Sequence, residues 1–204
     1  KYVGRVSLEQ PKRFEPMLSV EDSSYDPVAE LYAEVFEDIT VRRDEWRWVS
    51  SHLDGLGSEL SVLDIGCGNG ALLDALSNRL SRGEGVDASQ QMIEHAQARH
   101  VDQEHLSLTH IDGPSLPFED DQFDVVISFL SFRYLDWDPL MREVVRVLKP
   151  GGRILVVDMV TAPLRFTEVL LLLRSKWTYA RVKREHPVFY ERLQRLVSTP
   201  EWRQ

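Results

Sequence analysis

The sequence predicts an α/β protein with a doubly wound, mostly parallel sheet, preceded by helices and followed by a helical C-terminal segment. Three observations lead to this fold class. From residue 60 onward, short apolar segments alternate with segments of helical period. Residues 125–127 and 154–157 are apolar throughout, as expected of parallel strands that helices cover on both faces. A glycine-rich turn joins the first apolar segment to the helix that follows it.

Residues 1–58 are expected to form an N-terminal arm and two helices. Asp26 and Pro27 are a typical helix start, with a capping carboxylate and a proline at the first helical position. Apolar side chains then recur at steps of three and four as far as Ile39, which predicts one amphipathic helix. A second helix is predicted over residues 46–56, because glycines follow the same kind of apolar pattern.

Residues 59–160 are expected to form the core of the fold. Strands are predicted near residues 60–65, 83–87, 106–111, 123–129 and 153–158. Helices are predicted near residues 70–81, 89–99 and 138–149. The last of these helices begins with Asp138-Pro139 and should end at Lys149-Pro150-Gly151-Gly152, a sequence that cannot continue a helix.

Residues 161–204 are expected to be a helical lid segment, because no further strand pattern follows residue 160. This segment includes the apolar run 169–173 and the basic run 181–184, which we interpret as a solvated helix face. We interpret residues 1–204 as a single domain, since a chain of this size buries one core.

The composition argues against several classes of function. The net charge of −9 disfavours a nucleic-acid partner, which needs a basic surface. The only cysteine, Cys67, excludes an internal disulfide and fits a reducing compartment, so we expect a cytoplasmic location. No membrane span is expected, because the longest apolar run, residues 169–173, is far too short to cross a bilayer.

The most informative segment runs from Val62 to Gly70 and reads VLDIGCGNG. It predicts a strand, a glycine-rich turn and a helix start, where a ligand can lie against bare backbone. The glycine spacing is G-x-G-x-G, whereas the dinucleotide-binding fingerprint is G-x-G-x-x-G. Asp64 lies two residues before the first glycine, where it would repel a pyrophosphate but suits a ligand with cationic groups.

Carboxylates also follow the next two predicted strands. Asp87 lies about one β-α-β step after Asp64 and can accept hydrogen bonds from both hydroxyls of a ribose. Ser89 can cap the following helix, and Met92, one turn into it, could pack on an adenine ring. Asp112 follows the third strand and could accept a hydrogen bond from an adenine amino group.

Taken together, these segments resemble the class I S-adenosylmethionine-dependent methyltransferases, and most closely the small-molecule enzymes of the quinone-biosynthesis and natural-product type. The resemblance spans residues 25–158. It implies a Rossmann-like fold, S-adenosylmethionine as cofactor and S-adenosylhomocysteine as product. It also implies transfer of a methyl group by in-line displacement to an oxygen, nitrogen or carbon atom of a small organic acceptor. The cofactor-binding residues that it implies are Tyr25, Asp64, Gly66, Cys67, Gly68, Asp87, Ala88, Met92, Asp112, Gly113, Ser128 and Phe129.

The resemblance also assigns a place to each part of this set. Residues 66–68 would line the methionine end of the cofactor, and Asp87 would bind its ribose. Ala88 would help to frame the adenine, together with Met92 and Asp112. Residues 128–129 would face the methyl group. Tyr25 and Tyr32 resemble the tyrosines that close over the cofactor in many relatives.

Several of these residues keep a second interpretation. Asp64 could instead orient the glycine turn through backbone N–H groups. Met92 could be a core residue, and for Tyr32, on the apolar stripe of its helix, we prefer core packing. Cys67 is expected to be a small side chain in the turn and not a nucleophile.

The sequence assigns no general base. The candidates for catalysis are Arg133 and Tyr134, for which loop-surface roles are preferred, and His110 at a strand end. Many relatives carry a histidine pair after the fourth strand, where this chain has Leu130-Ser-Phe-Arg-Tyr134. No metal site is expected, because the histidines between residues 95 and 110 fall on different elements.

Two other functions stay open. A degenerate relative could bind S-adenosylmethionine without catalysis, which the missing histidine pair allows. A nicotinamide-dependent oxidoreductase is disfavoured by the glycine spacing and by Asp64. The acceptor cannot be identified from these residues, and a homodimer stays open because residues 169–173 could form its seam. We expect the sixth and seventh strands of the family to lie beyond residue 204.

Overall fold

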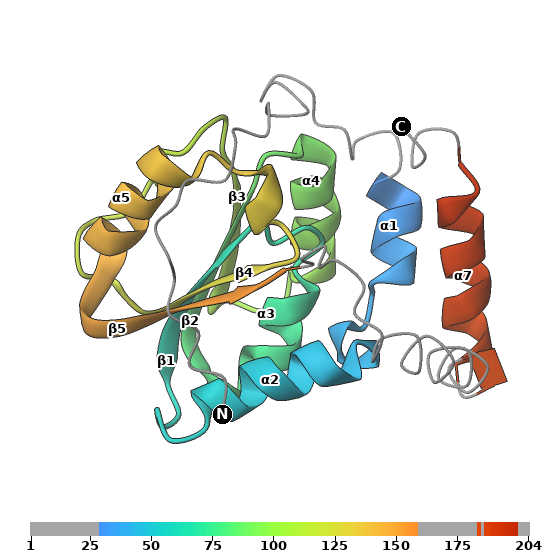
Figure 1. The fold of residues 1–204 in the computed structure, drawn as a ribbon, viewed down its shortest axis with the longest axis horizontal. Helices are drawn as coiled ribbons and strands as arrows, with labels where there is room; N and C mark the ends of the chain where they lie inside the picture. The colour runs from blue at the N-terminus through green and yellow to red at the C-terminus, as the bar shows by residue number, and fades with distance from the viewer. Residues whose placement is uncertain (1–28, 159–182, 185, 200–204) are drawn as a thin grey trace, which may run out of the picture.

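The computed structural model describes residues 29–158, 183–184 and 186–199, and within them it contains a five-stranded sheet (Figure 1). The strands are β1 (Leu60–Ile65), β2 (Leu80–Asp87), β3 (Leu106–His110), β4 (Phe123–Phe129) and β5 (Leu148–Val157). Every neighbouring pair is parallel, and the order is β3-β2-β1-β4-β5. The chain therefore changes direction across the sheet between β1 and β4, which confirms the predicted doubly wound fold.

Helices cover both faces of this sheet. They are α2 (Arg43–Leu53), α3 (Ala71–Leu76), α4 (Gln90–Arg99) and α5 (Trp137–Val147). Helices α2, α3 and α4 lie on one face and α5 on the other (Figure 1). Val62 of β1 packs into the first apolar cluster and its neighbour Leu63 into the second. Because alternate side chains point to opposite faces, a strand covered on both sides must be apolar at every step.

Helices α1 (Ala29–Val35) and α7 (Pro187–Val197) lie side by side next to α4 (Figure 1). Val35 and Phe36 pack with Leu196 in a small apolar cluster. Arg192 of α7 donates a hydrogen bond to the carbonyl oxygen of Glu34 at 2.8 Å. The helical segment around α1 is therefore supported from two sides.

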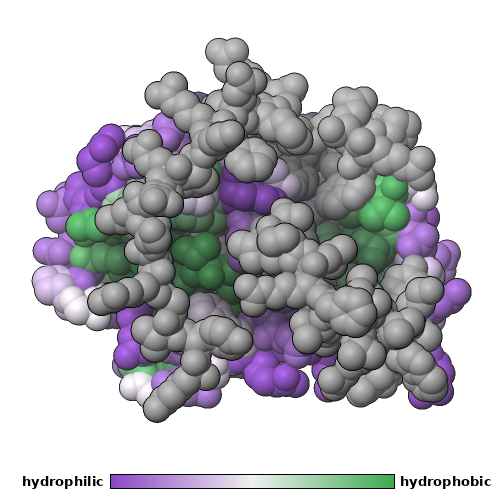
Figure 2. Space-filling model, viewed as in Figure 1, coloured by the Kyte–Doolittle hydropathy of each residue, from purple (hydrophilic) through white to green (hydrophobic). Residues whose placement is uncertain are grey.

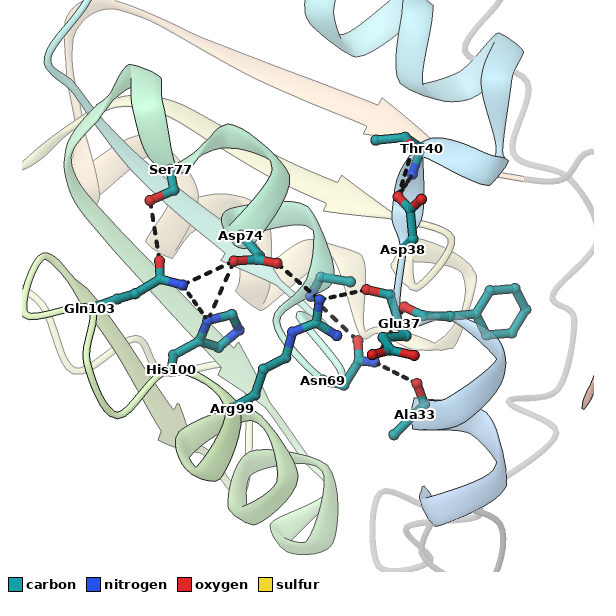
Figure 3. Close-up of polar contacts among 12 residues, drawn as sticks. Ala33, Glu37, Asp38, Thr40, Asn69, Asp74, Ser77, Arg99, His100 and Gln103 are labelled. Atoms are coloured by element: carbon teal, nitrogen blue, oxygen red, sulfur yellow. Dashed lines mark hydrogen bonds and ion pairs between the residues drawn. The ribbon is translucent and has the colours of Figure 1, made fainter. Parts of the chain in front are cut away.

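A buried amide fastens α1 to the glycine turn (Figure 3). Asn69 is 4% exposed, and its Nδ2 donates to the carbonyl oxygens of Ala33 and Phe36 at 3.1 and 3.2 Å. Carbonyls at the end of a helix lack partners within that helix, so this amide satisfies them. The Oδ1 of Asn69 accepts a hydrogen bond from the N–H of Ala71 at 3.3 Å. One side chain therefore fixes the position of α1 relative to the turn.

A second polar group joins the same elements from the side of α4 (Figure 3). Arg99 donates to the carbonyl oxygen of Glu37 at 2.6 Å and to the Asp74 carboxylate at 2.9 Å. Gln103 donates to the other oxygen of Asp74 at 3.0 Å. Partial burial raises the pKa of Asp74, but the hydrogen bonds from Gln103 and Arg99 outweigh it and the pKa is lowered overall.

The N-terminal helix is shorter than predicted. It ends at Val35, and Ile39 lies in a separate 3-10 turn, η2 (Ile39–Val41). The side chain of Asp38 accepts a hydrogen bond from the N–H of Thr40 at 2.8 Å and starts this new turn. The predicted helix start at residues 26–27 lies outside the described residues.

The third predicted helix is also too long. Helix α3 ends at Leu76 and is followed by the 3-10 turn η3 (Ser77–Arg79). Leu80, which the helical spacing placed in the helix, begins β2 and pairs with Leu60 of β1. The pairing of β2 with the central strand therefore overrides local helical propensity.

The fifth strand begins earlier than predicted. Helix α5 ends at Val147, and β5 begins at Leu148, which pairs with Phe123. The expected break at residues 149–152 is therefore an irregular stretch inside the strand, with Gly151 at φ +82°. Helix α4 agrees with the prediction. The hydroxyl of its N-cap residue, Ser89, accepts a hydrogen bond from the backbone N–H of Met92 at 3.1 Å.

The surface shown in Figure 2 is mixed in character. Hydrophobic side chains gather over the region of α5, β4 and β5, and hydrophilic ones predominate along the edge formed by α2. Among the residues that the structure describes, no helix combines the length and apolar character needed to cross a bilayer.

We predict that Asn69→Ala loosens α1 without unfolding the sheet. The substitution leaves two helix-end carbonyls without their donor, which should lower the free energy of unfolding by about 1–3 kcal/mol. Hydrogen exchange measured by mass spectrometry should show faster exchange over residues 29–37. The exposed Asn78→Ala is the matched control and should leave both readings unchanged. Unchanged exchange over residues 29–37 in Asn69→Ala would contradict the proposed fastening.

Candidate functional site

The carboxyl ends of β1, β2 and β4 meet at one edge of the sheet, beside α1. A cavity at this edge is walled by α1, η2, the glycine turn and the residues that follow β4. It brings together five of the predicted site residues, namely Asp64, Gly66, Cys67, Gly68 and Phe129. This is the switch point of the sheet, where ligands bind in doubly wound folds.

The glycine turn adopts a backbone that other residues could not follow. Gly66 has a φ of +75°, and a Cβ there would lie 2.3 Å from the hydroxyl oxygen of Ser131. That hydroxyl is fixed, because it donates to the carbonyl oxygen of Ile65 at 2.8 Å. Gly70 also has a φ of +75°, and a Cβ there would lie 2.7 Å from Nε2 of His100. At its glycines the turn therefore offers bare backbone, with no room for a side chain at Gly66 or Gly70.

Asp87 holds the glycine turn against the start of α4. Its Oδ2 accepts from the N–H of Gly68 at 2.8 Å, and its Oδ1 accepts from the N–H of Ser89 at 2.8 Å. Burial raises the pKa of Asp87, and hydrogen bonds from the backbone N–H groups of Ser89 and Gly68 offset part of this rise. Ala88 also donates a backbone hydrogen bond to this carboxylate, and because a carboxylate offers about four lone-pair sites, it can still accept a hydrogen bond from a ligand.

Asp64 lies deeper and is 1% exposed. Its Oδ1 has no hydrogen-bond partner among the described residues. Burial and the nearby charge of Asp87 raise the pKa of Asp64 to about 8. A buried polar atom without a partner is costly, so this oxygen marks a place where a cationic group would be stabilised.

The alternative interpretation of Asp64 is not what the structure shows. The N–H groups of Gly66 and Cys67 donate to the carbonyl oxygen of Val86 at 2.8 and 3.1 Å, and that of Gly68 donates to Asp87. The turn is therefore oriented by β2, and Asp64 does not orient it. The sequence could not assign this role, since it depends on which strand lies beside β1.

The ends of β2 and β3 bring together most of the residues predicted around the adenine. Asp87 and His110 are neighbours in the register of these two strands. The Nε2 of His110 lies 3.0 Å from the carbonyl oxygen of Ala88 and 3.3 Å from the carboxylate of Asp112. Met92 is 2% exposed, so its side chain is buried beside this edge. Gly113, which follows the aspartate, borders open space.

The end of β4 forms the remaining wall. Ser128 is buried, and its hydroxyl lies 2.9 Å from that of Ser131. Phe129 and Leu130 both line the cavity. Leu130 has a φ of +63°, which is rare for a leucine, and its N–H donates to the carbonyl oxygen of Val157 at 2.6 Å. Strained backbone of this kind often occurs at functional sites.

Arg133 and Tyr134, in the 3-10 turn η4 (Phe132–Tyr134), are linked to β5. The guanidinium of Arg133 forms an ion pair with Asp158, and its backbone N–H donates to the same carboxylate at 2.8 Å. The guanidinium also lies 4.6 Å from the ring centre of Tyr134, which is 52% exposed. These contacts hold η4 against the end of β5.

Two further predicted residues have defined surroundings. Tyr32 lines the cavity, lies close to Gly68 and also packs on Phe36, with ring centres 4.6 Å apart. Tyr32 therefore packs against Phe36, as the preferred interpretation expects, and it also lines the cavity. Cys67 is buried, and burial raises the pKa of its thiol well above the usual value, which argues against a nucleophile. Tyr25 lies outside the described residues.

The sequence did not identify half of the cavity wall. The missed residues are Phe36, Ile39, Arg42, Asn69, Leu72 and Leu130. The four apolar ones follow patterns that equally predict core packing. Asn69 stands between the glycines of the motif, so the sequence could have pointed to it. Arg42 lies between two predicted helices and belongs to no motif.

The residues at this edge fit S-adenosylmethionine. The unpartnered Oδ1 of Asp64 can accept from an ammonium, and the glycine turn leaves room where a Cβ would clash with its surroundings. Asp87 at the end of β2 offers lone pairs to ribose hydroxyls.

Comparison with known proteins agrees with this geometry. A family model described as a methyltransferase domain matches residues 63–156. The demethylmenaquinone methyltransferase of Clavibacter sepedonicus is 30% identical over 141 residues, which are 68% of this chain and 58% of the relative. The demethylmenaquinone methyltransferase of Staphylococcus aureus (strain MRSA252) is 36% identical over 108 residues, 51% of this chain and 45% of the relative. The chain thus spans about half the length of the curated relatives it matches.

Solved structures extend the comparison. The YcgJ protein of Bacillus subtilis has a TM-score of 0.53 and 33% identity, covering 57% of this chain and 50% of that one. The family's matched segment contains the glycine turn, Asp64, Asp87 and the end of β4, all of which meet at one edge of the sheet. Residues 63–156 of the chain therefore match a methyltransferase domain, and the two relatives and the solved structure are each similar to this chain over more than half of its length.

Proposed function

We propose that this chain is an enzyme that transfers a methyl group from S-adenosylmethionine to a small organic acceptor. The observation that carries this proposal is the buried, unpartnered carboxylate oxygen of Asp64 in the wall of the glycine-turn cavity. A cationic ligand would satisfy this oxygen and favour its charged form, whereas a dinucleotide pyrophosphate would be repelled by that charged form. This contrast disfavours the oxidoreductase alternative.

Each predicted site residue receives a role under this proposal. Asp64 accepts from the ammonium, and residues 66–68 lie along the methionine end of the cofactor. Asp87 accepts from the ribose hydroxyls. The adenine lies among Ala88, Met92, Asp112 and Gly113, and the methyl group faces Ser128 and Phe129. Tyr25 would close over the cofactor from the N-terminal side.

The cofactor supplies a methyl group on a sulfonium, which is already activated for displacement. What the chain adds is position and exclusion of water. The buried walls formed by Phe36, Phe129 and Leu72 keep water away from the methionine end. Holding two reactants in line can be equivalent to an effective concentration of about 10⁵ M or more. No general base is assigned, and Arg133, Tyr134 and His110 keep the structural contacts described above.

The acceptor is proposed to be a small organic molecule methylated on an oxygen, nitrogen or carbon atom. Two relatives are named demethylmenaquinone methyltransferases. A geranyl diphosphate C-methyltransferase of Streptomyces coelicolor A3(2), solved with S-adenosylhomocysteine, has a TM-score of 0.50 and 25% identity, covering 54% of this chain and 41% of that one. These names favour carbon acceptors on lipid-like or aromatic molecules as the first to test.

We further propose that residues 1–204 act as one domain, in which residues 161–204 shape the acceptor side as a lid. A cytoplasmic location and a homodimer are part of this proposal, with no nucleic-acid partner. The single free thiol and the net charge of −9 support the location and the exclusion of nucleic acid.

The proposal is tested by calorimetric titration with S-adenosylmethionine, followed by transfer of a labelled methyl group to a panel of demethylated quinols and prenyl diphosphates. We expect binding and label on at least one acceptor. Absence of binding by the folded protein would defeat the proposal. Binding without transfer to any acceptor would favour the non-catalytic alternative, and an increase in NADH fluorescence on mixing would favour the oxidoreductase.

We predict that Asp87→Asn weakens S-adenosylhomocysteine binding at least tenfold. The amide removes the charge and replaces one acceptor oxygen by an NH2 donor. The ribose hydroxyls and the N–H groups of Gly68 and Ser89 then compete for the one remaining oxygen. The exposed Asp102→Asn is the control and should bind like the native chain. Equal binding by both variants would contradict the role of Asp87.

We predict that S-adenosylmethionine binding releases close to one proton per molecule near pH 7. Asp64, with a pKa of about 8, is mostly protonated in the free protein, and the bound ammonium should favour its carboxylate. Affinity should therefore rise between pH 6 and pH 7, by up to about tenfold. Titrations in buffers of different ionisation enthalpy measure the protons released.

The variant Asp64→Asn should bind more weakly and release no proton, with affinity independent of pH over the same interval. The ammonium of the ligand stays mostly charged between pH 6 and pH 7, since the pKa of an α-amino group is about 7.7–8.0. Proton release that persists in Asp64→Asn would show that another group is responsible.

A further inference from the structure

Arg42 presents a charge to the cofactor cavity, and within the described part of the chain no ion pair neutralises it. It follows η2, and its backbone N–H donates to the carbonyl oxygen of Ile39 at 3.1 Å. Its guanidinium lies 4.5 Å from the ring centre of Phe36, and both side chains line the cavity. Among the described residues, no hydrogen bond or ion pair involves this guanidinium.

Other partly buried arginines of the chain are satisfied. Arg99 binds Asp74, Arg133 binds Asp158, and Arg146 binds Glu143. Arg42 alone among these four lacks such a carboxylate, and burial lowers its pKa. Because a guanidinium has five donors and no acceptor, holding it half-buried without an anion is unfavourable. The position of Arg42 is therefore best explained by an anion from outside the chain.

The cavity contains an acidic and a basic side chain that do not pair with each other. Asp64 and Arg42 both line it, and no ion pair joins them. Asp64 offers an unpartnered oxygen, and Arg42 offers N–H groups that no side chain of the described residues accepts from. A ligand complementary to both must carry a cation and an anion close together, as the α-carbon of an amino acid does.

We propose that Arg42 binds the carboxylate of the methionine end of S-adenosylmethionine, while Asp64 binds its ammonium. This inference rests on the proposed function and adds to it a residue that selects the complete amino-acid end of the cofactor. Arg42 lines the cavity together with residues 66–68, which lie along that end. The acceptor side lies beyond β4, where Arg133 is already bound to Asp158.

The surroundings of Arg42 hold it in place for this task. The ring of Phe36 provides a flat support for the guanidinium, and the carbonyl oxygen of Phe36 is bound by Asn69 of the glycine turn. Phe36, which supports the guanidinium, is therefore held in a fixed position relative to the glycine turn. The planar fork of an arginine can donate two parallel hydrogen bonds to a carboxylate, which a lysine cannot.

The test measures the affinity of four chains for two ligands by calorimetric titration. The chains are the native protein, Arg42→Ala, Arg42→Gln and, as matched control, the exposed neighbour Arg43→Ala. The ligands are S-adenosylmethionine and decarboxylated S-adenosylmethionine, which keeps the ammonium and the sulfonium. Thermal melting by circular dichroism verifies that each variant is folded, and Arg42→Gln retains much of the contact with Phe36.

We expect the native chain to prefer S-adenosylmethionine over the decarboxylated ligand by about tenfold or more. Arg42→Ala and Arg42→Gln should lose about 10- to 100-fold in affinity for the former and change less than about twofold for the latter. Arg43→Ala should resemble the native chain.

Loss of equal size for both ligands, or no loss in either Arg42 variant, would overturn the inference and leave the proposed function standing. A native chain that binds neither ligand would overturn both. A native chain that binds S-adenosylmethionine without preferring it over the decarboxylated ligand would overturn only the role of Arg42.

Discussion

The structure depends on two carboxylates that end neighbouring parallel strands and share one buried edge. Asp64 and Asp87 lie beside the glycine turn, and the charge of Asp87 adds to burial in raising the pKa of Asp64. Asp87 is compensated by backbone N–H groups of the turn and of α4. Asp64 is not compensated, because the N–H groups within reach are already bound by β2. This asymmetry leaves one carboxylate for structure and one for a cationic ligand.

Helix α1 is the element that converts this edge into a cavity. The sheet and its covering helices would form the glycine turn without α1, but Tyr32 and Phe36 close the turn from above. Asn69 attaches the end of α1 to the turn, and Arg99 attaches the following residues to α4 (Figure 3). The residues of the α1 region that line the cavity are thus joined to the glycine turn, so the binding of a ligand and the position of α1 are expected to depend on each other.

The chemistry inferred for the site requires little from side-chain acids or bases. A sulfonium methyl group needs alignment and a dry environment, and the buried apolar walls supply both. Under the proposed function, the charged groups of the cavity would hold the amino-acid and ribose parts of the cofactor.

The sequence by itself determined the doubly wound sheet, the glycine turn and the carboxylates at the strand ends. Each of these follows from local chemistry, since apolar runs, glycines and aspartates at strand ends indicate strands, tight turns and polar strand ends from their neighbours in the sequence alone. Where strands begin was decided by pairing, as Leu80 shows by joining Leu60 instead of continuing α3. Only the tertiary structure could separate the roles of Asp64 and Asp87 and bring Arg42 into the cavity. The reason is that both outcomes depend on which distant groups share a buried space, and no local pattern of residues records that.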